Sequence, residues 1–451
     1  MAIRQLCTEA LYDGSLPRLL PSRGSGKASK ALVRSGSLPR RGNKLRIMCR
    51  LLAAAMVCVS CAVGFADVGG GTVRVGLCYG ETAPRSAVVR GKGRFQGGQG
   101  FGTFGGDLRV RANGGELVVG RFADETKVGN WVEMWPAGSD PWLEIGGYAY
   151  RGRLRIELQA DGGLKVINLL SVEDYVRGVV PNEMFADPEG YKVQAVASRT
   201  LALYIRDRAP RHEGEGFDVC ATGHCQVYRG VDSESPLSDE AVQATAGEIV
   251  TFHGKPILAA YHSNAGGATD EVDEVWPGSV KRDFTYLAVV KSPYDQSANR
   301  LPGYQWCYHW ERPISLAEVG QRLAARGQRV GEVQDLIVRQ RSRSNRVKDL
   351  EVVGRAGSAR VVGTAAVNQV LGTPSSKLHL KKRGNSFTAE GWGYGDGIGL
   401  SQQGALGMAW AGHSYQEILG HYYRGVSLAE DYGRGKSVAL AQPALKTARS
   451  R

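Results

Sequence analysis

The sequence predicts a mixed α+β fold, in which a β-rich N-terminal part precedes an α+β domain with a substrate groove. Residues 67–170 contain many short runs that alternate between apolar and polar side chains, which is typical of half-buried strands. Residues 191–204 carry the strongest helical pattern of the chain. The 61 glycines among 451 residues favour many tight turns over long helices, and an apolar fraction of 42% indicates a packed core.

We expect four segments along the chain. They are a basic leader with a signal segment at 1–66, a β-rich region at 67–165, an α+β catalytic domain at 166–430 and a basic disordered tail at 431–451.

The leader has the parts of an export signal. Lys44, Arg46 and Arg50 precede an apolar run at 51–65 that ends in small residues, as in a secretory signal. The run is short for a membrane span, and the alternative, a buried core helix, lacks an amphipathic period. Because the signal does not begin the sequence, we expect either a true start near Met48 or an unusually long positive segment. The predicted location is the periplasm or the cell envelope.

Strands and helices are expected in the following order. Alternating or short apolar runs predict strands at 72–77, 108–112, 116–119 and 154–158, and a hairpin turn at 161–163. Asp187 and Pro188 form an N-cap and first-turn pair that begins the helix through 204. Further helices are predicted at 240–246 and 316–326, and further strands at 249–252, 257–262, 335–341 and 349–353.

The net charge of +13 lies mainly at the two ends of the chain. Residues 1–66 carry +9 and residues 434–451 carry +5, which leaves −1 for residues 67–433. A nucleic-acid-binding protein carries its basic surface on the folded part, so this distribution argues against a nucleic-acid partner.

Glu183 is the leading candidate for acid/base chemistry. It lies in a loop after the apolar residues 179–181 and is flanked by Met184 and Phe185. Burial in such a loop raises the pKa of a carboxyl group, which then donates a proton near neutral pH. The alternative is a carboxylate that only interacts with the dipole of the following helix.

A series of motifs gives this glutamate a wider context. Residues 171–184 and 192–200 surround Glu183, and further motifs follow in order at 224–228, 261–267, 275–276 and 397–405. Together they resemble the stage II sporulation protein D / amidase-enhancer family, over roughly residues 150–425.

The resemblance implies a peptidoglycan lytic transglycosylase, in which Glu183 protonates the bond between MurNAc and GlcNAc. The same carboxylate then takes the proton of the MurNAc C6 hydroxyl, and a 1,6-anhydro ring closes. Water is not the nucleophile, so the second carboxylate of ordinary glycosidases is not required. The alternative is a non-catalytic wall-binding protein that enhances a cell-wall amidase. The implied partners are therefore peptidoglycan glycan strands and a cell-wall amidase.

Further site residues follow from the same resemblance. Lys192 and Arg199 match positions tied to activity, although Arg199 has the alternative of a structural ion pair. The turn at 263–267 suits close approach of the backbone to a sugar, and its alternative is a plain hairpin. The predicted substrate-binding residues are Gln226, Tyr228, Ser263, Asn264, Gly266, Gly267, Ser401 and Gln402.

Four cysteines lie outside the leader, namely Cys78, Cys220, Cys225 and Cys307. The resemblance implies zinc bound by His212, Cys220 and Cys225, with His224 as the substitute for His212. A Cys220–Cys225 disulfide is the alternative, because disulfides are the default in an oxidising compartment. No organic cofactor is implied.

Several aromatic side chains are candidates for stacking on sugar rings: Trp276, Trp306, Tyr308 and Trp310. Core packing is the alternative for most of them. The glycine-rich segment 391–397 is expected to form a flexible groove wall. It departs from the family pattern at Asp396, where the family usually has His, which puts the role of this loop in question.

Overall fold

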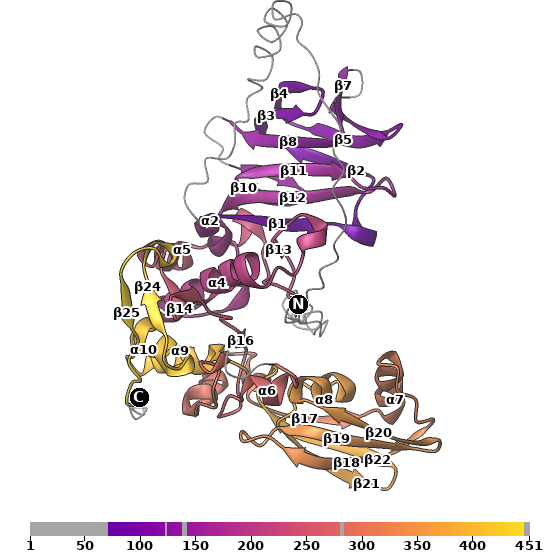
Figure 1. The fold of residues 1–451 in the computed structure, drawn as a ribbon, viewed down its shortest axis with the longest axis vertical. Helices are drawn as coiled ribbons and strands as arrows, with labels where there is room; N and C mark the ends of the chain where they lie inside the picture. Colours follow the sequence, from indigo (N-terminus) through magenta and orange to yellow (C-terminus); the bar gives the residue numbers. More distant parts are fainter. Residues whose placement is uncertain (1–70, 122–123, 138–141, 280–283, 446–451) are drawn as a thin grey trace, which may run out of the picture. The chain divides into compact units, whose positions relative to one another are not determined.

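The computed structural model describes residues 71–121, 124–137, 142–279 and 284–445 (Figure 1). The predicted leader and its signal segment lie outside the described residues. Within the described ranges, no helix combines the length and the apolar character that a membrane crossing requires.

Two sheets build the N-terminal part, and their strands pair antiparallel except that β13 joins β1 in parallel. The first has the strand order β13-β1-β12-β11-β8-β3-β4 and the second β10-β9-β2-β5-β6-β7, and buried residues of both belong to one hydrophobic core. The strands are β1 (Thr72–Cys78), β2 (Ser86–Arg90), β3 (Lys92–Gly97), β4 (Phe101–Gly105), β5 (Leu108–Asn113), β6 (Glu116–Arg121), β7 (Asp124–Gly129), β8 (Trp131–Pro136), β9 (Trp142–Ile145), β10 (Tyr148–Arg151), β11 (Arg153–Leu158), β12 (Leu164–Ser171) and β13 (Val219–Cys220).

The strand predictions in this part are confirmed. The runs at 72–77, 108–112, 116–119 and 154–158 coincide with β1, β5, β6 and β11. The hairpin between β11 and β12 closes where expected, with Leu158 paired to Leu164 and Gly162 at a φ of 84°. The alternation in β5 and β11 reflects one face packed on the core and one face toward solvent, whereas β6 is buried at four successive positions, 117–120.

A long helix, α4 (Pro188–Arg208), follows the short helices α2 (Val172–Arg177) and α3 (Val180–Glu183). As predicted, Asp187 caps α4 by accepting a hydrogen bond from the Gly190 N–H, and Pro188 occupies its first turn. Besides α2 and α3, three later helices pack against α4: α5 (Pro236–Ala244), α9 (Gln402–Trp410) and α10 (Tyr415–Tyr422). These contacts explain why α4 is buried along most of its length.

Two small sheets lie near α4 in the fold. One has the order β15-β14-β24-β25, and the other pairs β16 with β23 in parallel. The strands are β14 (Ile249–Phe252), β15 (Lys255–Pro256), β16 (Tyr261–His262), β23 (Leu400–Ser401), β24 (Ser427–Ala429) and β25 (Ser437–Ala439). The prediction of a disordered tail from residue 431 is wrong for residues 437–439, because β25 gains backbone hydrogen bonds from β24.

Residues 309–392 contain a second hydrophobic core, which includes Trp310, Leu350 and Phe387. Its elements are β17 (His309–Ile314), α7 (Leu316–Ala325), β18 (Val333–Arg341), β19 (Val347–Gly354), β20 (Gly357–Val362), α8 (Thr364–Leu371), β21 (Leu378–Arg383) and β22 (Ser386–Trp392). The predicted helix at 316–326 and strands at 335–341 and 349–353 are confirmed. The structure is therefore α+β with a β-rich N-terminal part, as the sequence predicts.

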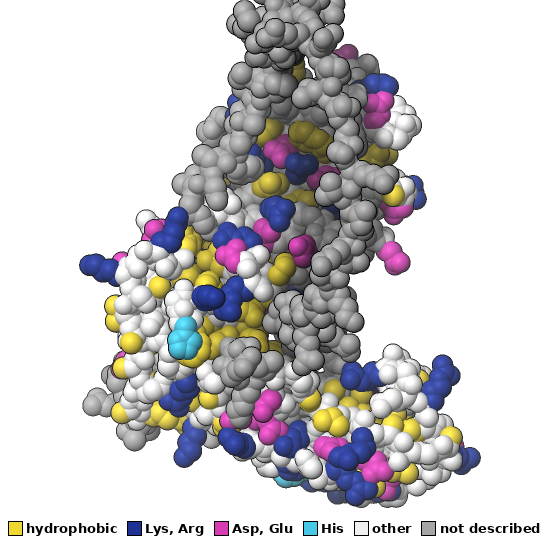
Figure 2. Space-filling view, viewed as in Figure 1, with side chains coloured by type: hydrophobic (Ala, Val, Ile, Leu, Met, Phe, Trp, Pro, Cys, Tyr) yellow, Lys and Arg dark blue, Asp and Glu magenta, His cyan; other side chains and the backbone are white. Residues whose placement is uncertain are grey.

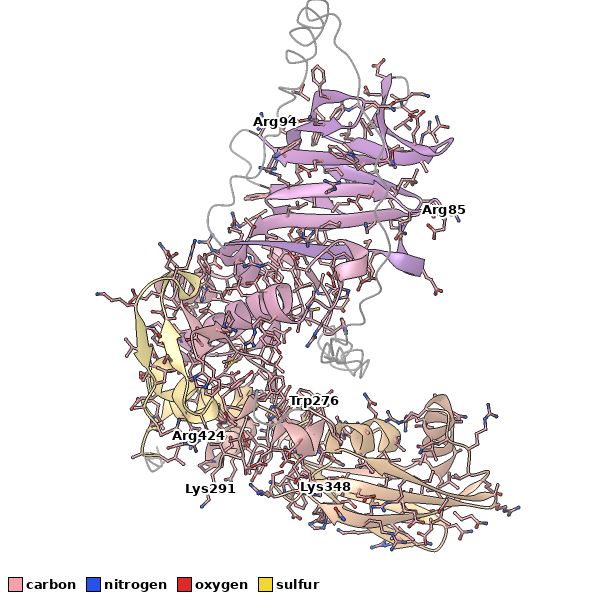
Figure 3. All side chains as sticks on the ribbon, viewed as in Figure 1. Arg85, Arg94, Trp276, Lys291, Lys348 and Arg424 are labelled. Carbon is pink, nitrogen blue, oxygen red and sulfur yellow. The ribbon has the colours of Figure 1, made fainter. Side chains whose placement is uncertain are left out.

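On the face shown in Figure 2, basic and acidic side chains of the described residues are interspersed. Trp276, labelled in Figure 3, follows α6 (Val272–Val275) and packs partly buried against the main core. The Lys348 amine, also labelled there, lies 2.9 Å from the Glu274 carboxylate and so joins β19 to α6.

Candidate functional site

Glu183 is the last residue of α3, and its side chain is half-buried. One carboxyl oxygen, Oε1, accepts a hydrogen bond of 2.5 Å from the Val227 backbone N–H. The Glu183 backbone carbonyl accepts a second bond, of 2.9 Å, from Nε2 of Gln402 at the start of α9. Both the carboxyl group and its backbone are therefore fixed, by segments that are remote in sequence.

A chain of buried polar groups leads to the same carboxyl group. The Tyr261 hydroxyl donates a hydrogen bond to Glu183. It accepts one of 3.0 Å from Nε2 of Gln226, whose Oε1 accepts one of 3.2 Å from the Tyr175 hydroxyl. Gln226 is fully buried, so its amide orients the tyrosine.

These surroundings set the acidity of Glu183. Burial raises the pKa of its carboxyl group from 4.5 to about 7, and the hydrogen bonds from Val227 and Tyr261 limit the rise. Near neutral pH the group therefore exists in both protonation states. The arrangement can donate a proton to an oxygen atom and then accept one.

The helix residues Lys192 and Arg199 have other partners. Nζ of Lys192 lies 2.7 Å from the Glu189 carboxylate and 5.7 Å from the centre of the Tyr415 ring. The fully buried guanidinium of Arg199 forms two bonds, of 2.8 and 2.6 Å, with the carboxylate of Glu173 on α2. Of the two interpretations of Arg199, its geometry favours the structural ion pair.

Hydrogen bonds to Asp295 hold the predicted substrate turn at 263–267 in place. The Asp295 carboxylate accepts bonds of 2.7 Å from the Gly267 N–H and 2.6 Å from the Ser401 hydroxyl. Asn264 is buried and donates to the Asp295 backbone carbonyl, at 2.9 Å. Gly266 adopts a φ of 65°, and a Cβ there would meet the backbone of Trp392 at 2.9 Å. The turn is therefore rigid, and its half-exposed members are Ser263 and Gly267.

The remaining predicted substrate contacts face inward. The Tyr228 hydroxyl donates to Oδ1 of buried Asn168, at 2.8 Å. Ser401 is buried and caps α9, while Gln402 also bonds Oε1 of Gln194 at 3.2 Å. These side chains therefore support the site through hydrogen bonds within the protein. Their assignment as ligand contacts stays a prediction.

Two histidines and two cysteines form a compact cluster beside this site, which we call the Cys/His cluster: His212, Cys220, His224 and Cys225. One ligand atom from each residue lies within 4.8 Å of all the others. Nε2 of His212 is 3.4 Å from the Cys225 sulfur, and Nδ1 of His224 is 3.6 Å from the Cys220 sulfur. The structure thus brings together both histidines that the sequence offers as alternatives.

The cluster has the chemistry of a cation site. A tetrahedral zinc ion holds its nitrogen and sulfur ligands roughly 3.5 Å apart, which the observed spacings match. Hydrogen bonds from Cys225, His212 and His224 hold the pKa of the Cys220 thiol well below its usual value, despite burial. Glu215 contacts the other ring nitrogen of His212, as a carboxylate does behind a metal-bound histidine. All four described cysteines are free thiols.

The glycine-rich segment 391–397 is ordered rather than flexible. Tyr394 and Asn264 exchange backbone hydrogen bonds of 2.8 and 3.1 Å. The Asp396 side chain is buried and accepts a bond of 3.1 Å from the Ile398 N–H. Gly397 lies against buried Arg346, which a Cβ would meet at 2.3 Å. The segment 391–397 is thus pinned to the substrate turn.

Comparison with known proteins finds two domain families that match successive parts of the chain. The stage II sporulation protein family matches residues 160–252, and a domain of unknown function, DUF8618, matches residues 261–399. Stage II sporulation protein D of Bacillus amyloliquefaciens is 31% identical over 279 residues, 58% of this chain and 75% of that protein. An uncharacterised protein of Brachyspira hyodysenteriae is 31% identical over 293 residues, 64% of this chain and 74% of that protein. The amidase enhancer of Bacillus subtilis is 30% identical over 291 residues, 56% of this chain and 40% of that protein.

Proposed function

Because the chain belongs to the stage II sporulation protein D family, we propose that it is an exported lytic transglycosylase that cleaves the MurNAc–GlcNAc bonds of peptidoglycan. One observation carries the proposal. Glu183 is a half-buried carboxyl group with a pKa of about 7, held by hydrogen bonds on its side chain and its backbone.

In the first step the protonated Glu183 donates its proton to the glycosidic oxygen as the bond from that oxygen to C1 of MurNAc breaks. The departing GlcNAc thereby gains a neutral hydroxyl group. Positive charge develops at C1, and the acetamido group of MurNAc stabilises it. The Val227 N–H and the Tyr261 hydroxyl stabilise the carboxylate that forms, since both favour the ionised state.

In the second step the Glu183 carboxylate removes the proton of the MurNAc C6 hydroxyl. The O6 atom then bonds C1 and closes the 1,6-anhydro ring. Glu183 regains its proton, so the enzyme returns to its starting state without a water molecule. A single carboxyl group serves both steps, and a pKa near the working pH suits both directions of proton transfer.

We assign a structural zinc ion to the Cys/His cluster, with His212, Cys220 and Cys225 as ligands and His224 as the fourth. Bound there, zinc neutralises thiolate charge and cross-links the loop. Cys225 precedes Gln226 and Val227, the residues whose amide and backbone N–H orient the Glu183 network. A fixed Cys225 therefore keeps the hydrogen-bond donors of Glu183 in place.

The similarity to the amidase enhancer favours a second candidate, a non-catalytic wall-binding protein that enhances an amidase. Lys192 and Arg199 also have partners other than Glu183. This candidate predicts binding to glycan strands without any change in them.

Purified glycan strands distinguish the two candidates. The wild-type protein is expected to produce 1,6-anhydroMurNAc ends, detected by mass spectrometry, and Glu183→Gln is expected to produce none. Glu240→Gln, a change of an exposed carboxylate on α5, is the matched control and keeps full activity. Binding of strands without anhydro ends in the wild type would select the amidase enhancer instead.

A further inference from the structure

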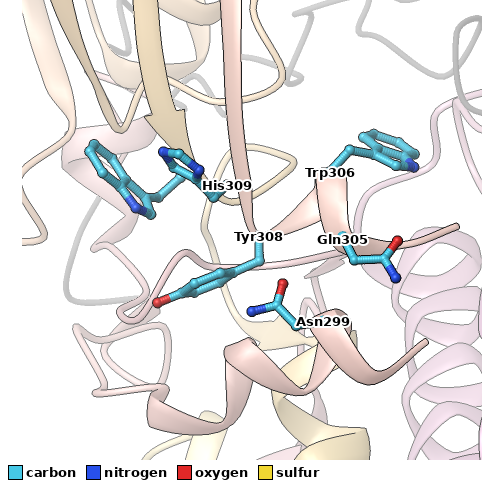
Figure 4. Close-up of a pocket in the computed structure, with 6 residues that line it drawn as sticks. Asn299, Gln305, Trp306, Tyr308 and His309 are labelled. Atoms are coloured by element: carbon cyan, nitrogen blue, oxygen red, sulfur yellow. The ribbon is translucent and has the colours of Figure 1, made fainter. Parts of the chain in front are cut away.

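A shallow aromatic pocket lies outside the Glu183 site (Figure 4). Its volume is about 630 Å³, and six side chains line it: Asn299, Gln305, Trp306, Tyr308, His309 and Trp392. Small-molecule sites in proteins span roughly 300–1,000 Å³. The pocket therefore has room for a sugar residue with its N-acetyl group.

The aromatic side chains of the pocket are held in place. Nε1 of Trp306 donates a hydrogen bond of 2.7 Å to the Gly303 carbonyl, and its ring meets Tyr394 edge-on at 5.0 Å. His309 and Trp392 face each other across β17 and β22, with ring centres 5.3 Å apart. Rigid rings form a binding surface that loses little entropy when a ligand packs on them.

The chemistry of the lining selects the ligand class. Five of the six side chains carry no charge, and the sixth, His309, contacts the Glu390 carboxylate, which is itself paired with Lys381 at 2.6 Å. Carboxylates and amines of a wall peptide would require opposite charges there. Aromatic faces beside the amides of Asn299 and Gln305 instead suit the apolar faces, hydroxyls and acetamido groups of a sugar.

The pocket shares its framework with the Glu183 site. Tyr394, which supports Trp306, exchanges backbone hydrogen bonds with Asn264 of the substrate turn. Asn299 lies on the 3₁₀ helix η5 (Pro293–Arg300), which also carries Asp295 and packs against α9. The first residue of α9, Gln402, holds the Glu183 carbonyl.

We propose that this pocket is a carbohydrate subsite that binds an N-acetylhexosamine unit of the glycan strand away from the bond that is cut. The proposal rests on the proposed function for the identity of the strand. The subsite holds the polymer in register, while Glu183 acts elsewhere on it. Trp306, Trp392 and Asn299 are its main contacts.

The test measures binding without cleavage. The full chain with Glu183→Gln is titrated with a tetramer of N-acetylglucosamine, and the dissociation constant is measured by calorimetry. Adding Trp306→Ala is expected to weaken binding roughly tenfold, the loss that accompanies removal of one aromatic anchor. Trp142→Ala, which changes a 37% exposed tryptophan on β9, is the matched control and leaves the dissociation constant unchanged.

A second variant tests the proposal in case Trp306→Ala misfolds. Asn299 is exposed, so Asn299→Ala leaves the fold intact and is expected to weaken binding severalfold. Unchanged dissociation constants in both Trp306→Ala and Asn299→Ala would overturn the subsite, as would displacement of the tetramer by a free wall peptide. Cleavage by Glu183→Gln would refute the proposed catalytic role alone, because the binding assay does not depend on it.

Discussion

Replacing Glu183 by Gln is expected to abolish cleavage and, at the same time, to stabilise the fold at alkaline pH. The pKa of this carboxyl group is about 7 in the folded chain, against 4.5 in its ordinary state. Below pH 4.5 the group is protonated in both the folded and the unfolded chain, so it does not affect folding. As the pH rises toward 7, the unfolded chain releases the proton and the folded chain keeps it, which disfavours folding.

The size of the effect follows from the difference between the two pKa values. At about 1.4 kcal/mol per pH unit, the rise from 4.5 to about 7 corresponds to about 3 kcal/mol of lost stability above pH 7. A glutamine does not ionise, and its side-chain oxygen still accepts the bond from the Val227 N–H. Glu183→Gln is therefore expected to unfold with a free energy up to about 3 kcal/mol higher than wild type at pH 8.

Urea denaturation at several pH values measures this difference directly. The gain in Glu183→Gln is expected to be largest at pH 8 and to shrink to near zero at pH 4.5. The control Glu240→Gln is expected to change little at either pH, because its side chain is exposed. Equal stability of wild type and Glu183→Gln at pH 8 would show that Glu183 has an ordinary pKa, and the acid/base argument would fail with it.

The remaining predictions concern the neighbours of this carboxyl group. Tyr261→Phe removes a donor that favours the ionised carboxylate, so the alkaline limb of the pH–rate profile is expected to move up by about one pH unit; an unmoved limb would contradict the hydrogen bond. Removal of metal by a chelator is expected to lower both the melting temperature and activity, with zinc content measured in parallel; full activity of metal-free protein would exclude the proposed structural role. Arg199→Ala is expected to lower the unfolding free energy by about 3–5 kcal/mol because it removes a fully buried guanidinium and leaves the Glu173 carboxylate without a cation, whereas Lys192→Ala is expected to lower it by less than about 1 kcal/mol. Denaturation curves of the two variants that coincide would refute this contrast.

The sequence predicts those strands and helices whose local pattern matches their burial. The alternating runs of β5 and β11 each have one face on the core, and Asp187 marks the start of α4. Strands β3 and β4 are missed because glycines interrupt their pattern. A Cβ at Gly102 would meet the ring of Phe95 at 2.8 Å, so close packing requires glycine where the sequence indicates a turn.

The site is predictable only in part, for a physical reason. Glu183 itself lies in a recognisable motif, but Val227 is 44 residues away and contributes only a backbone N–H. Any residue except proline supplies that group, so no side-chain pattern marks it. The role of Asp295 likewise cannot be recognised from the sequence, since this residue supports the substrate turn through hydrogen bonds that only the tertiary fold creates.

The positions of the motif residues distinguish those that support the site from the one that carries out proton transfer. Gln226, Ser401 and Gln402 occur in the ordered motifs, yet their polar atoms bond other parts of the protein. A carboxyl group whose pKa depends on burial needs surroundings that do not move, because one displaced donor shifts the balance between its two protonation states. This chemistry therefore requires many residues whose role is to hold one reactive group and its hydrogen-bond donors in place. It follows that substitutions at Gln226 should change the pH dependence of cleavage through Tyr261, whereas a true substrate contact would change substrate affinity.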